Sequence, residues 1–175
     1  MVYEQKFSIP EGVSVEKGEN GSIAVSGEKG RVDRVFVHPH VTLDINSDVL
    51  TAKTESKRNK DCAVVGTWIS HISNMSKGVK DGFVYKLKIV YTHFPVTVSV
   101  SGNKVEIKNF LGGKGLMIAD IIGDTKVEIK KDDVVVSGIN KDEVGQTAAN
   151  IERACKVKGK DRRVFQDGIY LVEKE

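Results

Sequence analysis

The chain has 175 residues, which is enough for one domain or two small ones. Hydrophobic residues make up 39% of it, no apolar run approaches the roughly 18 residues of a membrane span, and the first six residues lack the apolar core of a signal peptide. The formal net charge is only +3, but its distribution is uneven: residues 1–82 carry 11 basic and 11 acidic side chains, whereas residues 83–175 carry 16 and 13.

The first half opens with short strands. Residues 2–9 predict a strand that ends at Pro10. Two hairpins are predicted after it, because short runs with β-branched residues flank turn residues. They pair residues 13–15 with 22–25, and residues 41–45 with 49–54 across a turn at 46–48. Residues 31–37, between the hairpins, are either a strand or a short connection.

A helix is predicted over about residues 61–77, after a polar and basic loop at 56–61. Gly78 stands where a C-terminal cap is expected, and Asp81–Phe83 turns the chain. The apolar face of this helix is predicted to consist of Val65, Trp68 or Ile69, Ile72 and Met75.

The second half shows the same kind of pattern. Residues 96–100 and 104–108 predict a hairpin, and 134–138 a strand. Asn140 is a good N-cap, and Glu143 three residues on completes a capping-box pattern. The helix that follows has one apolar face, made of Val144, Ala148, Ile151 and Cys155. Gly159 is predicted to cap this helix, and residues 163–171 to return to a strand.

Several markers recur at one offset, which indicates an internal duplication. Gly112–Gly115 matches Gly27–Gly30 at an offset of 85, and Asp133-Val134 matches Asp48-Val49 at the same offset. We therefore predict an α+β fold of two duplicated small domains, each a mainly antiparallel sheet packed with one main helix. The predicted domains are residues 1–82 and 83–175, and the strand at 84–91 is a candidate bridge between them.

Residues for catalysis or metal binding are sparse. Cys62 and Cys155 both fall on predicted helices, which favours buried, reduced thiols and a reducing compartment. His38-Pro-His40 has no nearby third ligand, since His71 and His93 are distant in sequence, so a turn with two surface imidazoles is favoured over a metal site. No serine or cysteine nucleophile motif occurs. We expect no enzymatic activity.

The strongest chemical signal is a basic run. Residues 153–163 contain six basic side chains and one acid. Cations near a helix C-terminus are stabilised by the macrodipole, but that accounts for two or three of them and not for six. Lys and Arg also neutralise phosphates, so the run favours binding of a polyanion.

Two weaker features belong to the same half. Gln146, Asn150 and Arg153 share a second face of the predicted helix, which is either an ordinary solvated face or a polar face that contacts a ligand. Gly112–Gly115, with Lys114, is either a tight turn or a loop that lets backbone N–H groups approach a phosphate. It lacks the spacing of a P-loop.

Five stretches, taken together, resemble a known family, the ribosomal large-subunit protein six family, in its archaeal and eukaryotic branch. They are residues 9–15, 25–30, 109–112, 145–151 (Gly-Gln-Thr-Ala-Ala-Asn-Ile) and 160–174 (Lys-Asp-Arg-Arg-Val-Phe-Gln-Asp-Gly-Ile-Tyr-Leu-Val-Glu-Lys). The likeness covers nearly the whole chain. One departure is Glu28, where the family often has proline.

The resemblance implies a structural rRNA-binding protein of the cytoplasmic ribosome, with no catalysis, no cofactor and no small-molecule substrate. It implies that the second domain is the main anchor, near the sarcin–ricin region and the stalk base, with neighbouring ribosomal proteins as further partners. The alternative is a duplicated α+β adaptor that binds protein without RNA. The residues expected to contact rRNA are Gly112, Gly113, Lys114, Gln146, Asn150, Arg153, Lys156, Lys158, Lys160, Arg162 and Arg163.

Overall fold

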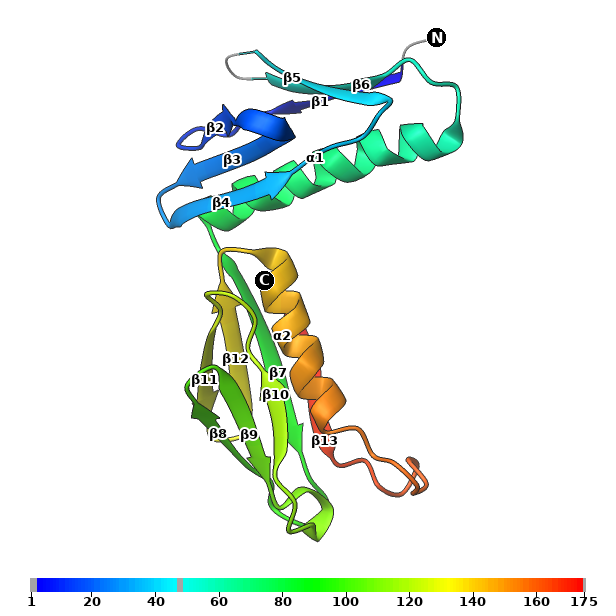
Figure 1. Ribbon diagram of the computed structural model, residues 1–175. Helices are drawn as coiled ribbons and strands as arrows, with labels where there is room; N and C mark the ends of the chain where they lie inside the picture. Colours follow the sequence, from blue (N-terminus) through cyan, green and yellow to red (C-terminus); the bar gives the residue numbers. More distant parts are fainter. Residues whose placement is uncertain (1–2, 47–48, 175) are drawn as a thin grey trace. The chain divides into compact units, whose positions relative to one another are not determined.

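The computed structural model describes residues 3–46 and 49–174 (Figure 1). The chain divides into two compact units, one ending at Gly82 and the other beginning at Phe83. Every strand pair in the described residues is antiparallel, and each unit contains one long helix. The predicted fold class, two duplicated α+β domains with mainly antiparallel sheets, is confirmed.

The first unit contains two three-stranded sheets and the helix α1 (Asn59–Lys80). One sheet has the order β1-β6-β5, from Tyr3–Ser8, Val49–Thr54 and Val41–Asn46. The other has the order β2-β3-β4, from Ser14–Lys17, Ser22–Gly27 and Gly30–Val35. Both predicted hairpins are therefore confirmed, and the ambiguous segment at 31–37 is mostly strand. The predicted turn at 46–48 falls partly on residues 47 and 48, which lie outside the described residues.

The helix α1 buries the face that the sequence indicates, with Val65, Trp68, Ile72 and Met75 inward, whereas Ile69 is half-buried. The prediction that Gly78 caps it is wrong, because the helix continues to Lys80. Val79 is fully buried, and a Cβ atom on Gly27 would lie within 2.8–3.0 Å of it. This close contact with β3 favours another helical turn beyond Gly78. The chain then turns at Gly82, whose φ is +75°.

The second unit repeats the order of strand, three-stranded meander, hairpin and helix. Its smaller sheet has the order β10-β9-β8, from Met117–Asp120, Lys104–Lys108 and Thr97–Ser101. Its larger sheet has the order β11-β12-β7-β13, from Lys126–Lys130, Asp133–Gly138, Phe83–Val90 and Gly168–Lys174. The helix α2 (Lys141–Ala154) precedes β13. The strand β13, next to β7, is the element that makes this sheet four-stranded.

The structure of the second unit differs from the sequence prediction at two points. The terminal strand begins at Gly168 and not at residue 163, because residues 162–164 form a turn and residues 165–167 are irregular. The strands β10 and β11 were not predicted; the sequence analysis left both segments unassigned. The strand at 84–91, the candidate bridge, is β7, an interior strand of the larger sheet that pairs with both β12 and β13.

The helix α2 begins as the sequence indicates and ends earlier. The Asn140 side chain accepts a hydrogen bond from the N–H of Asp142 at 3.1 Å and donates one to Glu143 Oε1 at 3.0 Å. The capping pair is thus present. In a full capping box Glu143 accepts the backbone N–H of Asn140, whereas here it accepts the side-chain amide of Asn140. The predicted cap at Gly159 is wrong, since the helix ends at Ala154. Gly159, with φ of +69°, lies in the loop that follows.

The four predicted apolar residues of α2 form the helix side of the core of the second unit. Val144, Ala148, Ile151 and Cys155 are all buried there, against strand residues such as Leu87. None of the helices in the described residues is long and apolar enough to cross a membrane.

Candidate nucleic-acid interface

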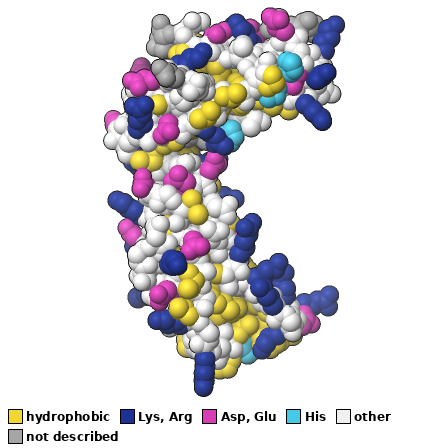
Figure 2. All heavy atoms as spheres, in the orientation of Figure 1, with side chains coloured by type: hydrophobic (Ala, Val, Ile, Leu, Met, Phe, Trp, Pro, Cys, Tyr) yellow, Lys and Arg dark blue, Asp and Glu magenta, His cyan; other side chains and the backbone are white. Residues whose placement is uncertain are grey.

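The loop between α2 and β13, residues 155–167, contains most of the basic run. Figure 2 shows Lys and Arg side chains gathered over this loop. Within the described part of the chain, none of its cations has a carboxylate as an ion-pair partner. The exposed cations of the run are Arg153, Lys156, Lys158, Lys160, Arg162 and Arg163. Their charges are therefore available to an anionic partner.

Asp161, the one acid of the basic run, is engaged by the loop itself. Its Oδ1 accepts the N–H of Arg163 at 2.9 Å, and its carbonyl oxygen accepts the N–H of Phe165 at 2.9 Å. The carboxylate thus forms an Asx-type turn in place of an ion pair. This contact shapes the loop and leaves the neighbouring cations without an ion-pair partner among the described residues.

The ring of Phe165 attaches the loop to the segment that follows β7. The Lys160 Nζ lies 4.4 Å from the centroid of this ring, within the range of a cation–π contact. The imidazole of His93 stacks on the same ring, with centroids 5.0 Å apart and planes at 28°. One cation of the run is therefore held in place by an aromatic pair.

Asp167 fixes the C-terminal end of the loop. It is only 1% exposed, its Oδ1 accepts the N–H of Thr92, and its Oδ2 lies 3.6 Å from His93 Nδ1. The hydrogen bond from Thr92 offsets part of the cost of removing this charge from water, whereas Oδ2 accepts no hydrogen bond among the described residues. The segment Thr92–Pro95 thus anchors the basic loop.

The same segment also contacts the glycine-rich loop. The side-chain amide of Asn109 donates to the carbonyl oxygen of Pro95 at 2.9 Å. Gly112 has a φ of +73°, and a Cβ atom there would lie 3.1–3.2 Å from the ring of Phe94. A side chain at this position would strain the backbone and would also displace the exposed Phe94 ring by a few tenths of an ångström. The structure thus places Gly112 against the segment that also holds the basic loop, and Gly112, Gly113 and Lys114 are all exposed.

The polar face of α2 is partly engaged within the protein. The Gln146 amide donates to Asn150 Oδ1 at 2.9 Å, and the Asn150 amide donates to the carbonyl oxygen of Asp120 at 3.0 Å, at the end of β10. Gln146 is exposed and Asn150 half-buried. Arg153, one turn further on, is exposed and lies beside the basic loop.

The sequence analysis missed the residues that hold this surface together. Thr92, His93, Phe94 and Asp167 lie far apart along the chain or in a segment without a motif. The one signal is that Asp167-Gly168 repeats Asp81-Gly82 at an offset of 86, one residue more than the other markers; this indicates a turn but gives no partner for the carboxylate. Only the antiparallel pairing of β13 with β7 brings Asp167 beside Thr92.

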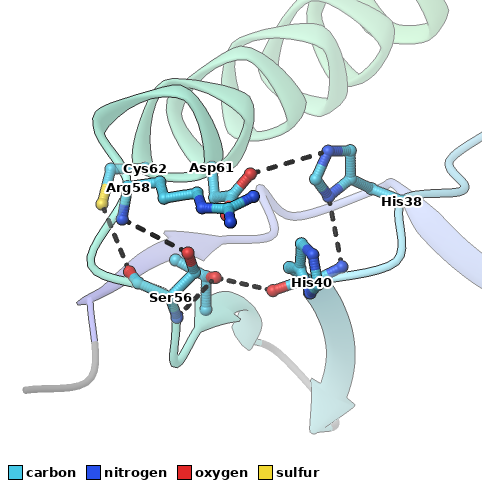
Figure 3. A network of polar contacts seen from close by, with 7 residues as sticks. His38, His40, Ser56, Arg58, Asp61 and Cys62 are labelled. Atoms are coloured by element: carbon cyan, nitrogen blue, oxygen red, sulfur yellow. Dashed lines mark hydrogen bonds and ion pairs between the residues drawn. The ribbon is translucent and has the colours of Figure 1, made fainter.

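The His38-Pro-His40 motif lies in the first unit, near the start of α1 (Figure 3). His38 Nε2 lies 3.9 Å from Oδ1 of the buried Asp61, and His38 Nδ1 accepts the N–H of His40 at 3.3 Å. No group of three His, Cys, Asp or Glu side chains among residues 3–46 and 49–174 could hold a metal ion. The nearby cations Lys57, Arg58 and Lys60 are exposed.

Comparison with known proteins gives one consistent family. The family profile described as ribosomal protein L6 matches two segments, residues 9–82 and 94–168. These segments fall on the two structural units. The double match agrees with the duplication indicated by the repeat offset.

Individual relatives share this similarity over nearly their full length. The chain is 47% identical to the large ribosomal subunit protein uL6 of Methanobrevibacter smithii, over 98% of this chain and 96% of that protein. It is 49% identical to uL6 of Aeropyrum pernix (98% and 94%) and 53% identical to uL6 of Methanosphaera stadtmanae (95% and 90%). The chain belongs to the ribosomal protein L6 family.

Proposed function

We propose that the chain anchors itself on large-subunit rRNA through its second unit, near the sarcin–ricin region and the stalk base. Membership of the L6 family makes it a structural constituent of the large ribosomal subunit and not an enzyme. The contact residues are those of the basic run and of the glycine-rich loop. Neighbouring ribosomal proteins near the stalk base are its further partners.

The observation that carries this proposal is a set of uncompensated cations on a loop fixed at its C-terminal end. Lys and Arg that neutralise phosphates release counterions, and this release supplies most of the affinity for a nucleic acid. The contacts of Phe165 and Asp167 hold the loop in one arrangement before binding. Less conformational entropy is then lost on association.

The two loops together suit folded RNA. A structured RNA presents its phosphates and 2′-hydroxyl groups in a fixed pattern, and proteins recognise that shape more than its sequence. Lys114 and the exposed glycines next to Phe94 can approach one part of the backbone while the cations of the 155–167 loop contact another. Arg side chains can also form paired hydrogen bonds to one phosphate.

The first test removes charge from the basic loop. The combined change of Lys158, Lys160, Arg162 and Arg163 to alanine should abolish selective binding of the full chain to large-subunit rRNA fragments, while circular dichroism shows a folded protein. The salt dependence of any remaining binding should be shallower, since each lost phosphate contact lowers the slope of log K against log salt concentration by about 1.

A matched control removes the same charge elsewhere in the second unit. Lys104, Lys126, Lys130 and Lys131 are exposed on or beside β9 and β11, away from the basic loop in sequence. Their combined change to alanine should leave selective binding in place. Full affinity in the folded loop variant, or equal loss in both variants, would show that this loop is not the anchor. Selective binding by neither the native chain nor the control would favour the adaptor function.

A further inference from the structure

A small pocket lies where the basic loop folds back between the end of α2 and the start of β13. It has a volume of about 270 Å³. Its floor is apolar and is made of Cys155, Val157 and Ile169, all buried. Burial raises the pKa of the Cys155 thiol to about 12, so the thiol is neutral at physiological pH and adds no charge to the floor.

Three cations and one aromatic ring line the pocket. Arg153, Lys156 and Arg162 line it together, and none of the three has an ion-pair partner among the described residues. Glu152 also lines it, but its Oε1 accepts the N–H of Leu171 at 2.8 Å and is thus engaged by β13. Three cations and one carboxylate give the lining a net positive charge.

Tyr170 is the aromatic lining residue, and its ring is held in position. It is 42% exposed, and its hydroxyl donates to the carbonyl oxygen of Gln166 at 3.3 Å. A Cβ atom on Gly168 would lie 2.9 Å from the ring, so only glycine leaves room for this placement. An exposed aromatic ring held beside free cations is a typical platform for a nucleobase.

We propose that this pocket takes one unpaired nucleotide of the rRNA, with its base against Tyr170 and its phosphate among Arg153, Lys156 and Arg162. The inference rests on the proposed rRNA-binding function and extends it. The phosphates of a base-paired RNA can be bound by cations at the protein surface alone. An apolar pocket with an aromatic ring can also bind an unstacked base. The anchor thus recognises an irregular element, such as a bulge or loop, and not a uniform duplex.

The test compares two small probes on the full, isotopically labelled chain. Adenosine monophosphate should shift the backbone NMR signals of residues 153–157 and 169–170, and should bind about tenfold more tightly than inorganic phosphate, since one stacked base contributes about a factor of ten or more. Equal affinity for both probes, or signals that move only elsewhere, would overturn the proposal.

Variants of the ring separate stacking from charge. Tyr170→Ala should remove the preference for adenosine monophosphate and weaken rRNA binding about tenfold, whereas Tyr170→Phe should keep both. Tyr91→Ala is the matched control, because Tyr91 is equally exposed, at 44%, and does not line the pocket. A Tyr170→Ala variant that keeps the preference would contradict the proposed role of the ring.

The outcomes distinguish this inference from the function on which it rests. If the basic-loop variant loses rRNA binding while Tyr170→Ala binds rRNA and both probes as the native chain does, the anchor stands and the nucleotide pocket is wrong. If the basic-loop variant keeps full rRNA affinity, the anchor itself is wrong, whatever the small probes show.

Discussion

At the scale of single residues, Cys155 shows how burial sets chemistry. It lies at the end of α2, is 3% exposed, and its thiol has a pKa raised from 9.0 to about 12 by loss of solvation. Cys62 lies in the first unit and is half-buried, and neither cysteine is in a disulfide. The predicted burial is confirmed for Cys155 and is wrong for Cys62.

This burial predicts a dependence of stability on pH. Above pH 9 the unfolded chain loses the Cys155 proton, whereas the folded chain keeps it until about pH 12. The folded state then binds more protons, so the contribution of Cys155 to the free energy of unfolding should fall as pH rises through this window, by at most about 1.4 kcal/mol per pH unit. Urea unfolding of the native chain and of Cys155→Ala across this range measures it. Parallel pH profiles for the two proteins would contradict the prediction.

At the scale of elements, the loop between α2 and β13 is set by contacts outside its own sequence. Asp167, His93 and Phe165 attach it to the segment after β7. The basic run alone indicates a solvated, repelling stretch of chain. In the structure the loop is instead anchored by a buried carboxylate and an aromatic stack.

Two substitutions of Asp167 should lower the stability of the protein by different amounts. Asp167→Ala leaves the N–H of Thr92 without its acceptor and His93 without its partner, and should cost about 1–3 kcal/mol of unfolding free energy. Asp167→Asn keeps the acceptor and should cost less. Hydrogen exchange of residues 156–166 should speed up in the alanine variant while that of 144–151 is unchanged.

The control for this series is Asp124, an exposed aspartate in a turn of the same unit. Its change to alanine should alter stability by less than about 0.5 kcal/mol. If Asp167→Ala and Asp124→Ala have the same effect on stability and on exchange, the carboxylate does not hold the loop.

At the scale of the whole molecule, the two duplicated units differ in their elements and in their charge. Both units repeat strand, meander, hairpin and helix, but the second adds the basic loop and β13. The first unit has equal numbers of basic and acidic side chains. The duplication gives two similar scaffolds. The basic loop between α2 and β13 makes the second of them the proposed rRNA anchor.

The proposed location can be tested on the assembled particle. The variant Lys158→Cys, carrying a tethered iron chelate, should direct hydroxyl-radical cleavage to the sarcin–ricin region and the stalk base of a reconstituted large subunit. The same chelate at Lys53, an exposed residue of the first unit, should give a different cleavage pattern. Cleavage from Lys158 confined to other rRNA regions would reject the proposed position while leaving family membership intact.

Local sequence determined the elements and the charge of this protein. The spacing of Val144, Ala148, Ile151 and Cys155 fixed one face of α2, and Asn140 fixed its start, because both depend on neighbours within two or three helical turns. The hairpins followed from adjacent turn residues. The end of α1 could not be predicted in this way, because the burial of Val79 against Gly27 is a contact between distant parts of the chain.

Only the tertiary structure decided how the site is assembled. The glycine-rich loop ends 38 residues before the basic run begins, and both contact the segment Thr92–Pro95. Asn150 was predicted on an open face, but the position of β10 gives its amide a partner within the protein. Such contacts join residues far apart in the chain, and a local pattern carries no information on which distant residue will be the partner.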